Sequence, residues 1–190
     1  MFHRLMPILL VIGATLTSHD PALSRSAHGG SAHVRNFSAE GISFSYPASW
    51  HTYRFPWASS FSTSLAYVSN LRLHRPCVGK PLGPNCQGPV MALPANSALL
   101  VWTENGFPGW TFSRAQGTLL RIHGRRARLR QLTPQTAWCP RHTSTMLETV
   151  IERPGAPDNW YDLRACISGP RSASVQRQVM AVLYSFHASR

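Results

Sequence analysis

Residues 97–103 read SALLVWT, a stretch in which apolar side chains follow one another without alternating with polar ones. Successive side chains of a β-strand point to opposite faces of its sheet. A strand built from this stretch must therefore be covered on both faces, which is typical of a central position in a sheet. We predict such a strand here. This strand decides the fold, because the other elements must supply the strands that pair with it and the segments that pack on its two faces.

Two later segments supply neighbouring strands. Residues 143–153 (TSTMLETVIER) and 159–168 (NWYDLRACIS) are rich in strand-forming residues, and the turn sequence PGAPD at 154–158 separates them. Together they predict an antiparallel hairpin. Glu148 and Glu152 share one face of the first strand, and we expect a cross-strand salt bridge from one of them to Arg164.

A second hairpin is predicted around 121–130, RIHGRRARLR, with its tip at 123–124. Beyond the tip, arginines alternate with apolar residues, which predicts a strand with one face in the core and these guanidinium groups on the other: Arg126, Arg128 and Arg130. They are candidate anion-binding residues. The same stripe also fits a second role, in which it keeps the sheet soluble and its edge unpaired.

The C-terminal segment predicts an amphipathic helix. After the break at 169–170, apolar residues recur at helical spacing on one face, and polar residues occupy much of the other side. The apolar face consists of Val175, Val179, Val182, Leu183 and Phe186.

The ordered part is expected to begin near Val34. Its first clear element is a strand over 42–46, where apolar and polar residues alternate, and Pro47 ends it. Residues 51–97 show no clear periodicity, and no element is predicted there before the strand at 97–103.

Several of these features together resemble a known family. They are the F-x-Y-P-x-x-W element within 44–50, a G-x-x-A corner at 124–127, an antiparallel strand pair and a final amphipathic helix. Their order is similar to that of PsbP-type domains found in small exported bacterial proteins, particularly of actinobacteria. The resemblance covers about residues 34–188. It implies an α+β fold, a PsbP-like sandwich in which helices pack on the faces of an antiparallel sheet and an amphipathic helix stands at the C-terminus.

The resemblance implies no chemistry. PsbP-type proteins range from photosystem subunits to a partner of a nuclear transport GTPase, and function must be argued from sites. The motif residues are structural ones, so no binding residue transfers to this chain.

The N-terminus predicts export. MFHR supplies positive charge, LMPILLVIGATLT an apolar run, and Ala22-Leu23-Ser24 a small-x-small cleavage pattern, which together are typical of a signal peptide over 1–24. The apolar run is shorter than the roughly 20 residues that a bilayer span needs. We therefore expect a secreted protein without a stable membrane span, with a flexible tail at 25–33 and a single α+β domain over 34–190.

The cysteines agree with export, because all of them follow the predicted signal and their number is even: Cys77, Cys86, Cys139 and Cys166. Such a set in an exported protein predicts two disulfides. Proximity favours Cys77 with Cys86, which leaves Cys139 for Cys166. A zinc site is the alternative, but the intervals of 9, 53 and 27 lack the closely spaced pairs typical of one. We predict no metal.

Catalytic motifs are absent from the sequence: it has no G-x-S-x-G, H-E-x-x-H, P-loop or G-x-G-x-x-G. One enzymatic alternative is a small basic hydrolase such as a ribonuclease, in which His123, Glu148 and Arg126 would meet on one sheet. General acid–base catalysis requires those groups to lie within hydrogen-bond reach of a substrate.

A binding role agrees better with composition. The chain has 19 Lys and Arg against 7 Asp and Glu, and this excess attracts polyanions. Trp57 and Trp110 stand beside Pro or Gly in expected loops and are candidate surface aromatics. The prediction is an exported, non-catalytic accessory or binding protein without a cofactor. Its ligand is unknown, with an anionic surface or an extracytoplasmic protein partner as the classes considered.

Overall fold

The computed structural model describes residues 33–56, 58–76, 89–134, 139–170 and 172–189, all within one compact unit, Ala32–Arg190. Several predicted features lie outside these residues: the signal peptide at 1–24, nearly all of the tail at 25–33, the side chain of Trp57, and the pairing of Cys77 with Cys86.

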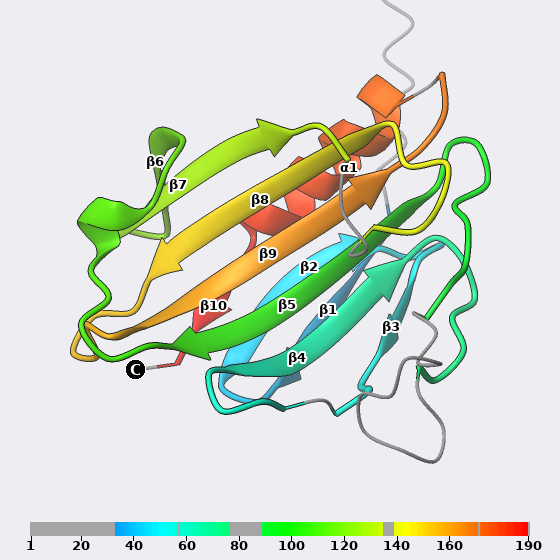
Figure 1. Cartoon of the computed structure of the whole chain (residues 1–190). Coiled ribbons are helices and arrows are strands. Elements are labelled where there is room, and N and C mark those ends of the chain that lie inside the picture. Colours follow the sequence, from blue (N-terminus) through cyan, green and yellow to red (C-terminus); the bar gives the residue numbers. More distant parts are fainter. Residues whose placement is uncertain (1–32, 57, 77–88, 135–138, 171, 190) are drawn as a thin grey trace, which may run out of the picture. The chain divides into compact units, whose positions relative to one another are not determined.

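Among the described residues, seven strands form the larger sheet, in which every neighbouring pair is antiparallel (Figure 1). The spatial order is β3-β4-β5-β9-β8-β7-β6. The bounds are β3 His51–Tyr53, β4 Ser62–Ser69, β5 Ala98–Gly106, β6 Thr118–Ile122, β7 Arg125–Leu132, β8 Thr145–Glu152 and β9 Asn159–Ile167.

A smaller antiparallel sheet and one α-helix cover one face of this large sheet (Figure 1). The small sheet contains β1 (Val34–Ala39), β2 (Ile42–Pro47) and the short β10 (His187–Ala188), and the helix is α1 (Ser172–Tyr184). The opposite face of the large sheet, turned toward the viewer in Figure 1, is called the open face below. The loop after β5 contains a single 3₁₀ turn, η1 (Phe112–Arg114).

The core lies between the two sheets and α1, and Trp102 of β5 stands at its centre. Its side chain is 0% exposed and stacks on Phe44 of β2 at 5.8 Å and on Phe186 after α1 at 4.4 Å between ring centroids. These contacts tie together the large sheet, the small sheet and the chain that follows the helix.

The predicted fold class is wrong. The chain is mostly β, with two antiparallel sheets and one α-helix among the described residues, and it is not an α+β sandwich with helices packed on its faces. The reason lies in two segments that were not recognised as strands: β1 and β4. The β1–β2 hairpin provides the cover that the resemblance assigned to a helix.

The individual strand predictions are confirmed where the sequence was periodic. The stretch 97–103 lies in β5, paired on both sides and buried on both faces. The segments 143–153 and 159–168 form the β8–β9 hairpin. The tip at 123–124 joins β6 to β7.

The C-terminal helix is also confirmed. α1 buries the predicted apolar side chains of Val175, Val179, Val182 and Leu183. Phe186 is buried as well, but it follows the end of the helix.

Replacing Trp102 by Ala should lower the free energy of unfolding by about 3–5 kcal/mol, because it removes a fully buried tryptophan ring and leaves a cavity between the sheets. Urea unfolding followed by circular dichroism measures this loss. The matched control is Trp110→Ala in the half-buried loop, where we expect a loss of about 1–2 kcal/mol. Equal losses in the two variants would contradict the central position of Trp102.

Candidate functional site

The open face of the sheet gathers charged side chains from three adjacent strands. In the register of β7, β8 and β9, Arg130 faces Glu148, which in turn faces Arg164. Opposite charges on neighbouring strands stabilise a sheet when they face each other in this way. The three residues form a row across the sheet, and the other charged side chains surround it.

Arg126, the first residue of the predicted stripe, binds a carboxylate on β8. Its Nε donates to Oε2 of Glu152 at 2.6 Å, and its Nη2 donates to Oε1 of the same residue. The hydrogen bond from Arg126 lowers the pKa of Glu152, and burial opposes this effect. The guanidinium also lies over the ring of Phe112, with Cζ 4.9 Å from its centroid.

Arg128 and Arg130 hold the loop at 107–117. Nη1 of Arg128 donates to the carbonyl of Gly117 at 2.9 Å, and Nη1 of Arg130 donates to Oε1 of Gln116 at 2.9 Å. Arg130 also binds Glu148 through Nε and Nη2. Gly117 has a φ of 111°, and a Cβ there would lie 2.4 Å from the carbonyl oxygen of Leu129, so only glycine fits this close approach.

The stripe therefore has a structural role that can be stated in contacts. Its three arginines lie on one face, as their alternation predicts, and each is engaged by a carboxylate, the loop backbone or a loop side chain. This arrangement favours a structural role, the second one considered for the stripe, over a dedicated anion site. A ligand at these arginines has to compete with their partners inside the molecule.

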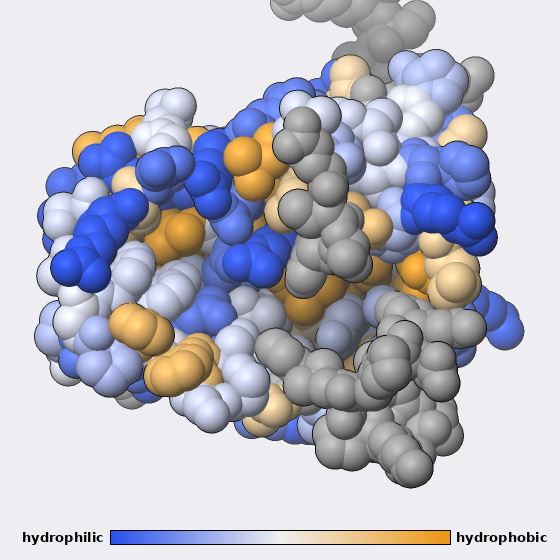
Figure 2. Space-filling model, in the orientation of Figure 1, coloured by the Kyte–Doolittle hydropathy of each residue, from blue (hydrophilic) through white to orange (hydrophobic). Residues whose placement is uncertain are grey.

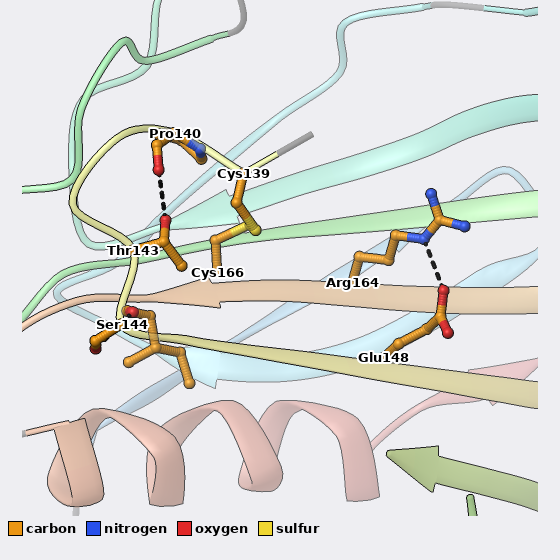
Figure 3. The surroundings of a disulfide bond; sticks show 8 residues. Cys139, Pro140, Thr143, Ser144, Glu148, Arg164 and Cys166 are labelled. Carbon is orange, nitrogen blue, oxygen red and sulfur yellow. Dashed lines mark hydrogen bonds and ion pairs between the residues drawn. A yellow bond between two sulfur atoms is a disulfide. The ribbon is translucent and has the colours of Figure 1, made fainter. Parts of the chain in front are cut away.

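Arg164 of β9 stands beside two carboxylates. Its Nε lies 2.9 Å from Oδ2 of Asp162 and 3.2 Å from Oε1 of Glu148. Figure 3 shows Arg164 and Glu148 facing each other on the side of the sheet away from the helix. A salt bridge to Arg164 was predicted from Glu148 or Glu152, and Glu148 is the residue that makes it.

Asp162 is the most unusual group of the cluster, because its side chain is almost fully buried on the open face. The residue is 2% exposed, and Oδ1 has no hydrogen-bond partner among the described residues. Burial raises the pKa of Asp162 to about 7. Arg164 opposes that rise, the charge of Glu148 adds to it, and Arg130 opposes it. Both the protonated and the ionised form of this carboxyl are therefore accessible near neutral pH.

Aromatic rings border the cluster at one end of β9. Trp160 precedes Asp162 on the same face, and Trp110 of the loop stacks on it with ring centroids 4.2 Å apart. Trp110, the predicted surface aromatic, is thus half-buried in a ring pair. Phe112 of the same loop is buried beside Arg126.

A disulfide borders the cluster at the other end of β9, where Cys166 bonds Cys139 (Figure 3). The predicted pairing of these two cysteines is confirmed. The segment that follows Cys139 is held further by Thr143, whose Oγ1 donates to the carbonyl of Pro140 at 2.6 Å. Figure 2, in the orientation of Figure 1, shows that this face of the molecule is hollowed, with hydrophilic residues (blue) near its middle and apolar residues (orange) in its depth.

The hypothesised catalytic trio does not assemble. His123 at the β6–β7 tip packs against His187, with ring centroids 3.6 Å apart. β7 begins at Arg125, directly after the tip that carries His123, whereas Glu148 faces Arg130 further along the strand. The step of five residues from Arg125 to Arg130 spans about 16 Å in a strand, so Glu148 lies far from the tip. Arg126 is bound to Glu152 instead.

Sequence reasoning missed Asp162 as a functional candidate. Its position opposite Thr103 and Val150, between Trp160 and Arg164, follows from the strand register. The available signal was an acidic residue inside a predicted apolar strand, a place where a carboxylate needs a partner or loses its charge.

No protein-family model matches the chain, and no curated protein matches it. The described ranges contain no helix with the length and apolar character that crossing a membrane requires. Within the same ranges, no three side chains of His, Cys, Asp or Glu come together as a set that could bind a metal.

Replacing both Cys139 and Cys166 by Ser should lower the free energy of unfolding by about 3–4 kcal/mol, since the crosslink closes a loop of 27 residues and restricts the unfolded chain. Urea unfolding under oxidising conditions measures the difference. A loss below about 1 kcal/mol would contradict this contribution of the disulfide to stability.

Asp162→Asn should change how stability depends on pH. When the pKa of a carboxyl is higher in the folded state than in the unfolded state, its contribution to stability is complete below the unfolded-state pKa. This contribution is lost as the pH rises through the folded-state pKa. Relative to the wild type, the Asn variant should therefore gain about 4 kcal/mol between pH 4 and pH 8, measured by urea unfolding at each pH.

The control variant, Glu152→Gln, should show a pH dependence of stability of the opposite sign. The pKa of Glu152 is lowered, so its contribution is present at neutral pH and is lost as pH falls through the folded pKa. Glu152→Gln should therefore be less stable than the wild type at pH 7 and approach it in acid. A stability difference between Asp162→Asn and the wild type that stays constant with pH would contradict a raised pKa.

Proposed function

We propose that this chain is an exported, non-catalytic binding protein whose open face recognises an anionic ligand or an acidic protein partner. The observation that supports it most is the charge of that face. Four arginines lie on β7 and β9 there, against two carboxylates, Glu148 and Glu152, and a third, Asp162, that is only partly ionised at neutral pH. An excess of positive charge in a hollow attracts anions and speeds their association.

Several features support location outside the cytoplasm. The Cys139–Cys166 disulfide is compatible with an oxidising compartment. The N-terminal sequence supports export for the reasons given above. The relationship to PsbP-type proteins is part of the same proposal, and the F-x-Y-P-x-x-W element and the C-terminal helix support it.

Binding of the mature chain to a defined polyanion, heparin, tests the charge of the open face. We expect affinity to fall steeply between about 50 and 500 mM salt, because binding neutralises charges and releases counterions. Replacing Arg126, Arg128 and Arg130 together by Gln should weaken binding about tenfold or more, measured by fluorescence anisotropy of labelled heparin. Circular dichroism checks that the variant is folded.

The matched control removes the same charge elsewhere. Arg35 on β1, Arg72 after β4 and Arg177 on α1 are exposed residues outside the cluster. Replacing these three by Gln should weaken binding much less. Equal losses in the two triple variants would show that net charge alone attracts the polyanion, and would contradict recognition by the open face.

A further inference from the structure

We propose that Arg164 is the residue that binds a compact oxyanion on the open face, and that the ligand displaces Asp162 from it while Asp162 takes up a proton from solvent. The proposal rests on the proposed function and deepens it. It moves the anion site from the predicted stripe on β7 to the neighbouring strand β9.

Exposure distinguishes the members of the cluster. The side chain of Arg164 is 37% exposed, whereas those of Asp162 and Glu148 beneath it are buried. The guanidinium of Arg164 is therefore more accessible to a solute than either carboxylate. The planar fork of a guanidinium matches the two oxygens of a carboxylate, phosphoryl or sulfuryl group.

The contact between Arg164 and Asp162 is replaceable. Oδ2 of Asp162 and Oε1 of Glu148 lie near the same Nε of Arg164, a nitrogen with one hydrogen to donate. Glu148 has a further partner in Arg130. Loss of Asp162 as a partner therefore leaves Glu148 paired on both sides.

Charge balance favours anion binding that is coupled to proton uptake by Asp162 over binding of the anion alone. The side chains of Arg130, Arg164, Glu148 and ionised Asp162 together carry no net charge, and a further anion would leave these four groups negative in a mostly buried place, which is costly. If Asp162 gains a proton on binding, a monoanion such as acetate leaves these groups neutral, and a dianion such as sulfate leaves one negative charge in place of two. The charged groups that face Asp162 are Arg164 on its own strand, Glu148 on β8 and Arg130 on β7. Its neighbour on β5, Thr103, is uncharged.

Asp162 is also the carboxyl of the cluster that is easiest to neutralise. It is buried, its Oδ1 has no hydrogen-bond partner among the described residues, and its pKa of about 7 makes proton uptake inexpensive near neutrality. An unpaired buried oxygen is costly in a folded protein. Protonation removes the charge that makes this burial unfavourable.

Isothermal titration with two probes tests the proposal. Sulfate stands for a tetrahedral phosphoryl or sulfuryl group and acetate for a carboxylate, and neither changes its charge between pH 6 and pH 8. At constant ionic strength, we expect at least one probe to bind about tenfold more weakly at pH 8 than at pH 6, because the neutral form of Asp162 becomes scarce. The probe that binds identifies the ligand chemistry.

Two variants assign the effect to residues. Arg164→Gln should abolish binding of the probe at both pH values. Asp162→Asn, which is permanently neutral, should bind it with the same affinity at pH 6 and pH 8. Arg177→Gln, which removes a charge from the exposed side of α1, outside the open face, should keep the dependence of the wild type. If the wild type binds equally at both pH values, or if Asp162→Asn keeps the tenfold change, the proton exchange is refuted.

The heparin experiment separates the two proposals. A protein that binds heparin through the open face but binds neither sulfate nor acetate would retain the proposed function and lose the Arg164 site. A protein that binds none of the three would lose both.

Discussion

The stack of Trp102 between Phe44 and Phe186 is the contact on which the rest of the structure depends. It places the middle of β5 against β2 and against the end of α1, so the small sheet and the helix must lie on the same face of the large sheet. Among the described residues, the segments over the opposite face are loops, and Leu73 and Leu93 of these loops pack with Leu99 and Val101 of β5 in a second hydrophobic cluster. The open face follows from this asymmetry, and charged residues can occupy its middle.

Charge pairing then organises the open face. Arginines of β7 and β9 alternate with carboxylates of β8, and loop 107–117 is fastened to the same arginines. Each of the three arginines that suggest a polyanion site by sequence is thus bound to a partner inside the molecule. Arg164 and Asp162 differ from the stripe, since their contact is shared with Glu148 and one of the two groups loses its charge near neutral pH.

The sequence predicted the elements with strong periodicity and missed those without it. The two-faced apolar run 97–103, the β8–β9 hairpin and α1 were recognisable from side-chain spacing alone. β4 was not, because serine, threonine and small residues interrupt its pattern and a bulge shifts its register between Ser64 and Ala66. Because β1 and β4 were not recognised as strands, the prediction assigned the cover of the sheet to helices. The predicted fold class was wrong for that reason.

The site was predicted in part. Alternation placed the three arginines on one face and predicted a salt bridge from Glu148 or Glu152 to Arg164, because both predictions follow from strand period and pairing. The role of Asp162 depends on burial by residues distant in sequence, which periodicity does not report. The pH titration of the Asp162 carboxyl carbon, followed by ¹³C NMR, therefore tests the account most directly. We predict a midpoint near pH 7 that rises when the oxyanion is added; a midpoint near pH 4 that does not respond to it would contradict the account.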